Sequence, residues 1–222
     1  MLKAVIFDLD GTLLDTAPDF YTTVNQLRQE EGLHALPDER IRAAVSNGAR
    51  ALVSMAFDLE FDAPGFDRLH KRLLEIYSEL LAVATRPFPG IQQTLDLLAE
   101  RNLGWGIVTN KSHTYTGPIL KALDLQPPPG SVVCPEDVSK TKPHPESLLL
   151  ACKQLNCEAH EAIYVGDHQR DIDCGKAAGS ITIAAAYGYV GDDIDPLDWK
   201  ADHIVQSAHE LRDIVARHLE KQ

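Results

Sequence analysis

The sequence predicts an α/β fold, a doubly wound parallel sheet with helices on both faces and an inserted α-helical segment. Three observations support this prediction. A short apolar, β-prone run opens the chain at residues 4–7. Purely helical periodicity follows it as far as residue 81. From residue 90 onward, apolar runs alternate with amphipathic stretches, as in repeated βα units.

The helical segment reads as an inserted subdomain over residues 16–81, with the core at 1–15 and 82–222. Its apolar residues recur every three or four positions over 19–29, 37–45, 48–57 and 66–81. A turn-rich link at 85–90 returns the chain to the core. We expect core helices at 91–101, 112–123, 144–155, 169–178 and 207–219, with a break or a new helix start at Gly117-Pro118. Strands are expected at 105–109, 131–134, 162–165, 181–185 and 203–205.

Composition excludes several classes of partner. A net charge of −12 and a pI near 5.1 argue against nucleic acid and anionic membranes. No apolar run reaches membrane-spanning length, and the start lacks a signal-peptide pattern. The four cysteines show neither a Cys-x-x-Cys pair nor a histidine at zinc spacing. We therefore expect a cytoplasmic protein with reduced thiols, either a monomer or a dimer.

Two carboxylates end the first strand. Asp8 and Asp10 are two residues apart, so on a strand they point the same way. Like charges this close need a cation between them, and oxygen ligands favour Mg2+. Gly11 lets the chain leave the strand tightly, and Thr12 offers a hydroxyl and an N–H for the substrate. The pattern predicts a magnesium site at the carboxyl end of the strand.

The run Asp8-Leu-Asp-Gly-Thr12 resembles the first motif of the haloacid dehalogenase-like phosphohydrolases. The resemblance implies a Rossmann-like core with a helical cap over the site. It also implies that Asp8 is a nucleophile that forms an aspartyl-phosphate, while Asp10 is a general acid and base. Both roles suit carboxylates. A hydroxyl, a lysine and a further acid should then follow at later strand ends.

The hydroxyl is supplied by Thr109, at the end of the strand at 105–109. A threonine here can simply cap the next helix. The family's second motif implies instead that Thr109 binds a phosphoryl oxygen and that Asn110 orients the substrate. Lys111, which follows them, is the weaker candidate.

Lys142 matches the lysine of the family's Lys-Pro-x-Pro segment, whereas Lys140 does not. Pro143 and Pro145 stiffen the backbone around it. A fixed ammonium there would neutralise charge on Asp8 and on the phosphoryl group.

The last acid lies in a segment that resembles the family's Gly-Asp-x-x-x-Asp motif. The resemblance makes Asp167 the third Mg2+ ligand, with Asp8 and the backbone carbonyl of Asp10. Asp171, one helical turn further on, would hold a metal-bound water or Lys142 from outside the ligand set. Taken alone, Asp167 is equally suited to cap a helix.

Other segments narrow the substrate class. Residues 13–16 and 46–50 resemble phosphoglycolate phosphatase-type members, and Arg50 would then reach a substrate carboxylate or remain solvated. Residues 104–111, 166–172 and 186–190 are similar to members that act on N-acetylmuramic acid 6-phosphate. We therefore expect a Mg2+-dependent phosphomonoesterase for a small phosphate ester, with both substrates open.

Two other functions are weighed against this one. A phosphomutase shares the aspartyl-phosphate but returns the phosphoryl group to a sugar. A receiver-like phospho-acceptor also uses acids, a threonine and a lysine around Mg2+. Receivers, however, carry the acid pair and the acceptor on different strands and have no inserted helices, which argues strongly against that alternative.

Overall fold

The structure is a computed structural model that describes residues 1–191, 194–220 of the chain. Within these residues six strands form one sheet in the order β5-β4-β1-β6-β7-β8, and every neighbouring pair is parallel. The strands are β1 (Ala4–Phe7), β4 (Gly104–Val108), β5 (Ser131–Val133), β6 (Ala162–Gly166), β7 (Ile181–Ala185) and β8 (His203–Val205). The predicted parallel α/β fold is confirmed.

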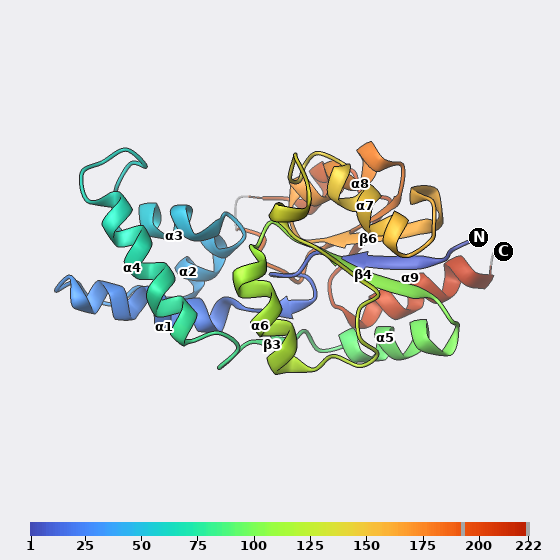
Figure 1. The fold of residues 1–222 in the computed structure, drawn as a ribbon, viewed down its shortest axis with the longest axis horizontal. Helices are drawn as coiled ribbons and strands as arrows, with labels where there is room; N and C mark the ends of the chain where they lie inside the picture. The colour runs from blue at the N-terminus through green and yellow to red at the C-terminus, as the bar shows by residue number, and fades with distance from the viewer. Residues whose placement is uncertain (192–193, 221–222) are drawn as a thin grey trace.

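Helices cover both faces of the sheet (Figure 1). One face carries α7 (Glu146–Gln154) and α8 (Gln169–Ala178), and the other carries α5 (Ile91–Glu100) and α9 (His209–Glu220). The four side chains of β1 are completely buried and alternate between two hydrophobic clusters, with Val5 and Phe7 in one and Ala4 and Ile6 in the other. This double burial explains why β1 is a continuous apolar run.

A group of four helices lies at the end of the molecule away from the chain termini (Figure 1). It comprises α1 (Ala17–Glu30), α2 (Asp38–Val45), α3 (Gly48–Phe57) and α4 (Phe66–Glu79). Each contributes completely buried apolar side chains: Leu27, Ile41, Leu52 and Leu73. The Phe20 ring of α1 stacks on Tyr77 of α4 with centroids 4.1 Å apart. Amphipathic faces that meet in this way account for the helical periodicity of the segment.

A two-stranded antiparallel pair joins the helical group to the sheet. It consists of β2 (Leu14–Asp15) and β3 (Arg86–Pro87), where the chain enters and leaves the helices. Two-residue strands are too short to show a periodicity, so the sequence did not predict them.

The helix α6 (His113–Leu123) is continuous, and the expected break at Gly117-Pro118 was wrong. Buried contacts of Thr116 and Ile119 hold the helix across the proline. The remaining short helices are η1 (Pro135–Asp137), η2 (Ala159–Glu161) and η3 (Pro196–Trp199). Cysteines 134, 152, 157 and 174 are free and buried. Across the described residues, no helix combines the length and apolarity needed to cross a membrane.

Candidate active site

The candidate site forms at the carboxyl end of β1, where Asp8 and Asp10 follow the buried strand. Strand pairing continues to Asp8, whose backbone N–H donates to the Val165 carbonyl at 2.9 Å. The chain then turns at Gly11, which has a φ of 83°. A Cβ at Gly11 would lie 2.1 Å from Oδ2 of Asp167, so glycine is needed for this close approach. The parallel register of β1 and β6 thus brings two of the predicted acids together.

Lys142 lies at the centre of the acids. Its Nζ is 2.7 Å from Oδ1 of Asp8, 2.7 Å from Oδ1 of Asp171 and 3.0 Å from the Val108 carbonyl oxygen. Only 1% of its side chain is exposed. Burial disfavours the ammonium, but the two carboxylates more than offset this and raise the pKa of Lys142 above its ordinary value. Lys142 is therefore a permanent cation in contact with the predicted nucleophile.

Three carboxylates lie close together here, and two of them contact Lys142. One oxygen from each of Asp8, Asp167 and Asp171 lies within 4.8 Å of the others. Burial raises the pKa of Asp8 to about 6, with added repulsion from Asp171 and despite the attraction of Lys142. Burial, followed by repulsion from Asp8 and Asp171, raises the pKa of Asp167 to about 8. The cluster carries more negative charge than Lys142 alone can neutralise.

The Asp171 carboxylate is bound by other groups of the protein. Besides the Lys142 contact, its Oδ2 accepts from the His168 N–H at 3.1 Å, and its Oδ1 accepts from the Tyr164 hydroxyl at 3.3 Å. The structure thus places Asp171 where it holds Lys142, one of the two arrangements expected from the sequence.

Asp167 is held by groups from three separate segments. Thr12 donates its hydroxyl to Oδ1 at 3.1 Å, and Oδ2 accepts from the Tyr189 N–H at 2.9 Å and from the Ser46 hydroxyl at 3.1 Å. A Cβ at Gly188 would lie 2.3 Å from the Asp167 Cβ, which explains the glycine there. Thr12 was expected to bind substrate, but in the structure its hydroxyl faces Asp167 because the turn at Gly11 packs against that carboxylate.

Asp10 has its own cation, Lys111. The two side chains form an ion pair of 2.8 Å, and Thr16 donates its hydroxyl to the same oxygen at 2.5 Å. Only 8% of the Lys111 side chain is exposed, and its Nζ lies 5.2 Å from the Phe20 ring centre and 5.0 Å from that of Tyr77. Burial opposes the charge, but Asp10 and Tyr77 together more than offset it and raise the pKa of Lys111. The weaker candidate of the sequence analysis is thus a buried partner of Asp10.

Thr109 and Asn110 line the same cavity as Asp8 and Asp10. The Thr109 hydroxyl accepts from the Lys111 N–H at 3.1 Å, and Asn110 donates its side-chain amide to the Lys142 carbonyl oxygen at 3.2 Å. The structure brings both to the site, as expected from their position after β4.

Arg50 does not reach this cavity, which contradicts the expected contact with a substrate carboxylate. Its guanidinium donates to the Phe61 carbonyl oxygen at 3.0 Å, pairs with Asp67 at 3.5 Å and lies 4.7 Å from the centre of the Phe66 ring. These partners all belong to the helical group, on the side of α3 that faces α4. The sequence showed the glycine turn before Arg50 but not which way the side chain would point.

Tyr189 is a residue that the sequence analysis did not single out. Its hydroxyl accepts from the N–H groups of Thr16 at 2.6 Å and Ala17 at 2.8 Å, and it donates to Asp15 at 2.9 Å. Arg42 of α2 pairs with Asp15 at 3.0 Å and lies 4.7 Å from the Tyr189 ring centre. The network joins the loop after β7 to the entrance of the helical group. Its only sequence signal is the Tyr-Gly-Tyr run after a predicted strand.

A cavity of about 370 Å³ opens above the carboxylates. The core contributes Asp8, Asp10, Lys111 and Lys142, and the helical group contributes residues from each of its four helices. Further lining residues include Phe20, Asn47, Tyr77, Tyr115, His168 and Arg170. A cavity that combines aromatic side chains with polar groups is typical of sites for small organic ligands.

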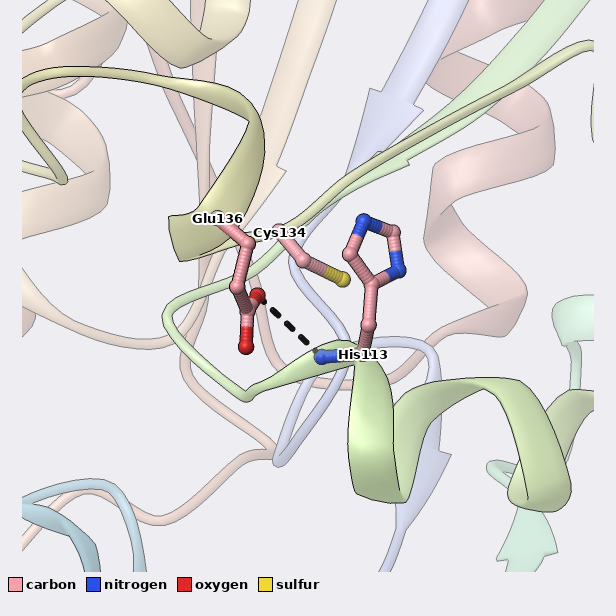
Figure 2. Close-up of side chains that lie close together, drawn as sticks. All are labelled: His113, Cys134 and Glu136. Atoms are coloured by element: carbon pink, nitrogen blue, oxygen red, sulfur yellow. Dashed lines mark hydrogen bonds between the residues drawn. The ribbon is translucent and has the colours of Figure 1, made fainter.

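A second group of potential metal ligands lies beside the loop that follows β4 (Figure 2). One ligand atom from each of His113, Cys134 and Glu136 falls within 4.8 Å of the others. These groups already have partners within the chain: Glu136 accepts from Ser112 and from the His113 N–H, and Asp137 accepts from His113 Nε2 at 2.7 Å. Because the carboxylates already have hydrogen-bond donors, we interpret the group as a structural contact that holds the loops after β4 and β5 together.

Comparison with known proteins defines the class. The model of the haloacid dehalogenase-like hydrolases matches residues 5–185. The chain belongs to this family, as its first motif indicated. In this structure the order of the strands brings the residues of the site together at the carboxyl end of β1.

Individual relatives are closely similar over their whole length. The chain is 43% identical to N-acetylmuramic acid 6-phosphate phosphatase of Pseudomonas aeruginosa, over 98% of this chain and 96% of that protein. It is 40% identical to phosphoglycolate phosphatase of Xanthomonas campestris pv. campestris, over 94% of each. Among solved structures, a predicted phosphoglycolate phosphatase from Haemophilus somnus 129PT superposes with a TM-score of 0.84 at 26% identity, covering 96% of this chain and 98% of that one.

Proposed function

We propose that this protein is a Mg2+-dependent phosphomonoesterase that forms an aspartyl-phosphate on Asp8 and acts on a small acidic phosphate ester. One observation carries the proposal: Asp8 ends a buried strand, in contact with the buried ammonium of Lys142 and within 4.8 Å of two further carboxylates. The names of the relatives at 40–43% identity, all phosphatases, support the same reaction.

The residues present fit a magnesium ion. Burial and repulsion raise the pKa values of Asp8 and Asp167, so an added cation would relieve the excess negative charge there. These two carboxylates would hold Mg2+ together with the backbone carbonyl of Asp10, the set that the family resemblance implies. When bound, the ion would reduce the repulsion between the negative phosphoryl group and the negative carboxylates. Asp171 would stay outside the set because it holds Lys142.

The chain supplies the remaining chemistry. A carboxylate oxygen of Asp8 attacks phosphorus, and the bond from phosphorus to the ester oxygen breaks. Asp10 acts in its protonated form once the ester is bound: it gives its proton to the departing oxygen, then takes a proton from the water that hydrolyses the aspartyl-phosphate. Phosphate leaves, and Asp8 is regenerated. Lys142 stabilises the negative charge on the phosphoryl oxygens, and Thr109 and Asn110 hold them in place.

We also propose that residues 16–81 act as a cap on a core formed by residues 1–15 and 82–222. Two contacts support this role: Ser46 of the helical group donates to Asp167 at 3.1 Å, and Asn47 accepts from Arg170 at 3.4 Å. A cap that touches the proposed metal ligand would exclude water as it closes. The β2–β3 pair, at both crossing points, is the natural hinge.

Both phosphoglycolate and N-acetylmuramic acid 6-phosphate are acidic esters, and the cavity favours the larger one. Clefts of about 300–1,000 Å³ hold ligands of drug size, and the cavity of about 370 Å³ falls in that range. The aromatic side chain of Tyr115, which lines the cavity and is partly exposed, offers a flat face for a sugar ring. A two-carbon acid would leave much of this space to water.

The test compares kcat/KM for the two esters with Mg2+ and with a chelator. We expect Mg2+-dependent phosphate release with preference for the muramic ester, and isomerisation without phosphate release would indicate a phosphomutase instead. Borohydride reduction of the acid-quenched enzyme should convert Asp8 to homoserine. Asp8→Asn should keep the fold, measured by circular dichroism, and lose turnover. Substantial activity in that variant would remove Asp8 from the nucleophile role.

A further inference from the structure

We infer that Arg170 selects acidic substrates by pairing with the carboxylate of the ester whose phosphoryl group meets Asp8. The inference rests on the proposed function and names the side chain that would distinguish an acidic ester from a neutral one. Arg170 stands in the first turn of α8, three residues after Asp167, and it lines the cavity. Its side chain is partly exposed, so a bound ligand can reach the guanidinium.

The charges around the cavity single out Arg170. Lysines and arginines that line the cavity within the described residues are Lys111, Lys142 and Arg170. Lys142 is shared between two carboxylates, and Lys111 is paired with Asp10. Arg170 has no carboxylate within ion-pair distance among residues 1–191 and 194–220. Among the lysines and arginines of the described residues that line the cavity, Arg170 is therefore the one whose charge is available for a substrate anion.

The present partner of Arg170 is weak and easily replaced. Its Nη2 donates to the side-chain carbonyl oxygen of Asn47 at 3.4 Å, a long contact with a neutral acceptor. A carboxylate would bind the guanidinium through two parallel charge-assisted hydrogen bonds. Asn47 directly precedes α3, so the contact spans the boundary between the helical group and the core. An acidic substrate bound there would touch both parts of the protein.

Arg170 approaches the cavity from a different element than the reacting carboxylates. Asp8 and Asp10 follow β1, whereas Arg170 lies in α8 and contacts Asn47 of the helical group. A substrate whose phosphoryl group meets Asp8 can therefore present its carboxylate to Arg170 in the same cavity. Arg50, the residue expected for this role from the sequence, is paired with Asp67 and does not line the cavity.

The experiment uses pairs of esters that differ in the acid alone. N-acetylmuramic acid 6-phosphate is compared with N-acetylglucosamine 6-phosphate, which lacks the lactyl carboxylate, and 2-phosphoglycolate is compared with ethyl phosphate. A charge-assisted bond contributes enough for Arg170→Ala to lower kcat/KM on the acidic member by about 10- to 100-fold. The neutral member should change less than about threefold by the same reasoning, since it makes no such bond.

Matched variants separate selection from a structural effect. Arg50→Ala removes an arginine of the helical group outside the cavity and should leave the discrimination between the paired esters intact. Asn47→Ala removes the present partner of Arg170 and should keep the preference for acids. An equal loss on acidic and neutral esters in Arg170→Ala would make Arg170 a positioning residue and overturn the inference, as would no loss on either.

Calorimetric titration gives a readout that does not depend on turnover. The Asp8→Asn variant is titrated with both members of each pair, with and without Arg170→Ala. We expect tighter binding of the acidic member and loss of that advantage in the double variant. Retained advantage would overturn the inference even if the protein is an efficient phosphatase. Loss of the advantage together with no phosphate release by the unaltered enzyme would support Arg170 and refute the proposed function.

Discussion

Replacing Lys142 by methionine should lower the Tm of the metal-free protein substantially. Methionine keeps most of the side-chain volume and removes the charge that touches Asp8 and Asp171, each at 2.7 Å. The side chains of Lys142 and Asp171 are each only 1% exposed, so water cannot take the place of the ammonium. Breaking a buried ion pair by removing one partner costs about 3–5 kcal/mol. For a protein of this size that lowers Tm by about 6–20 °C.

The assay is thermal unfolding followed by circular dichroism in a chelator, at pH 8 and pH 5. The loss should be larger at pH 8 than at pH 5, because the pKa of Asp8, about 6 beside Lys142, rises further when the ammonium is removed, so Asp8 is protonated and uncharged at pH 5. Excess Mg2+ should restore part of the Tm, because a bound cation supplies the missing charge. Activity should also fall, since Lys142 stabilises the phosphoryl group in the proposed mechanism.

Lys140→Met is the matched control. Lys140 is exposed and lies two residues before Lys142, so its replacement should leave Tm nearly unchanged. The reasoning would be refuted if Lys142→Met melted within about 2 °C of the unaltered protein at pH 8, which on the same scale is less than about 1 kcal/mol. A loss that was equal at pH 5 and pH 8 would show that packing, rather than charge, had been removed.

Three further predictions follow from the site. Lys111→Met should lower kcat by about 10- to 100-fold because Asp10 loses a charge-assisted bond, and it should lower Tm less than Lys142→Met does because it leaves one carboxylate unpaired rather than two; an unchanged kcat would separate Lys111 from catalysis. The pKa values of Asp8 and Asp167, raised to about 6 and about 8, mean that the folded protein binds protons more tightly than the unfolded chain. The Tm in a chelator should therefore rise as pH falls from 8 to 5, and the stabilisation by Mg2+ should be greatest at pH 8; the opposite slope would contradict the assigned shifts. Tyr189→Phe leaves two backbone N–H groups without their acceptor and should cost about 1–3 kcal/mol in denaturant unfolding, and a variant as stable as the parent would show that water replaces the hydroxyl.

The strand-end acids illustrate what local sequence can determine. Asp8 and Asp167 each follow a short run of apolar residues, and such runs predict strands that are buried on both faces of a sheet. Parallel strands end on the same side of the sheet, so their polar ends must gather there. Lys142 was indicated by its resemblance to the family's Lys-Pro-x-Pro segment, in a loop that follows another strand. The fold and the central charge cluster were therefore determined by the sequence itself.

Side-chain direction was decided only by the tertiary structure. Arg50 and Arg170 are both arginines near the start of a helix, yet one pairs with Asp67 and the other lines the cavity. Lys111 follows a strand end like many solvated lysines, but the rings of Phe20 and Tyr77 enclose it. In each case the partners come from helices distant in sequence, and their identity depends on how α1, α3 and α4 pack. Periodicity predicts that a helix has a buried face, but only the packed structure shows which charged groups the neighbouring helices place beside it.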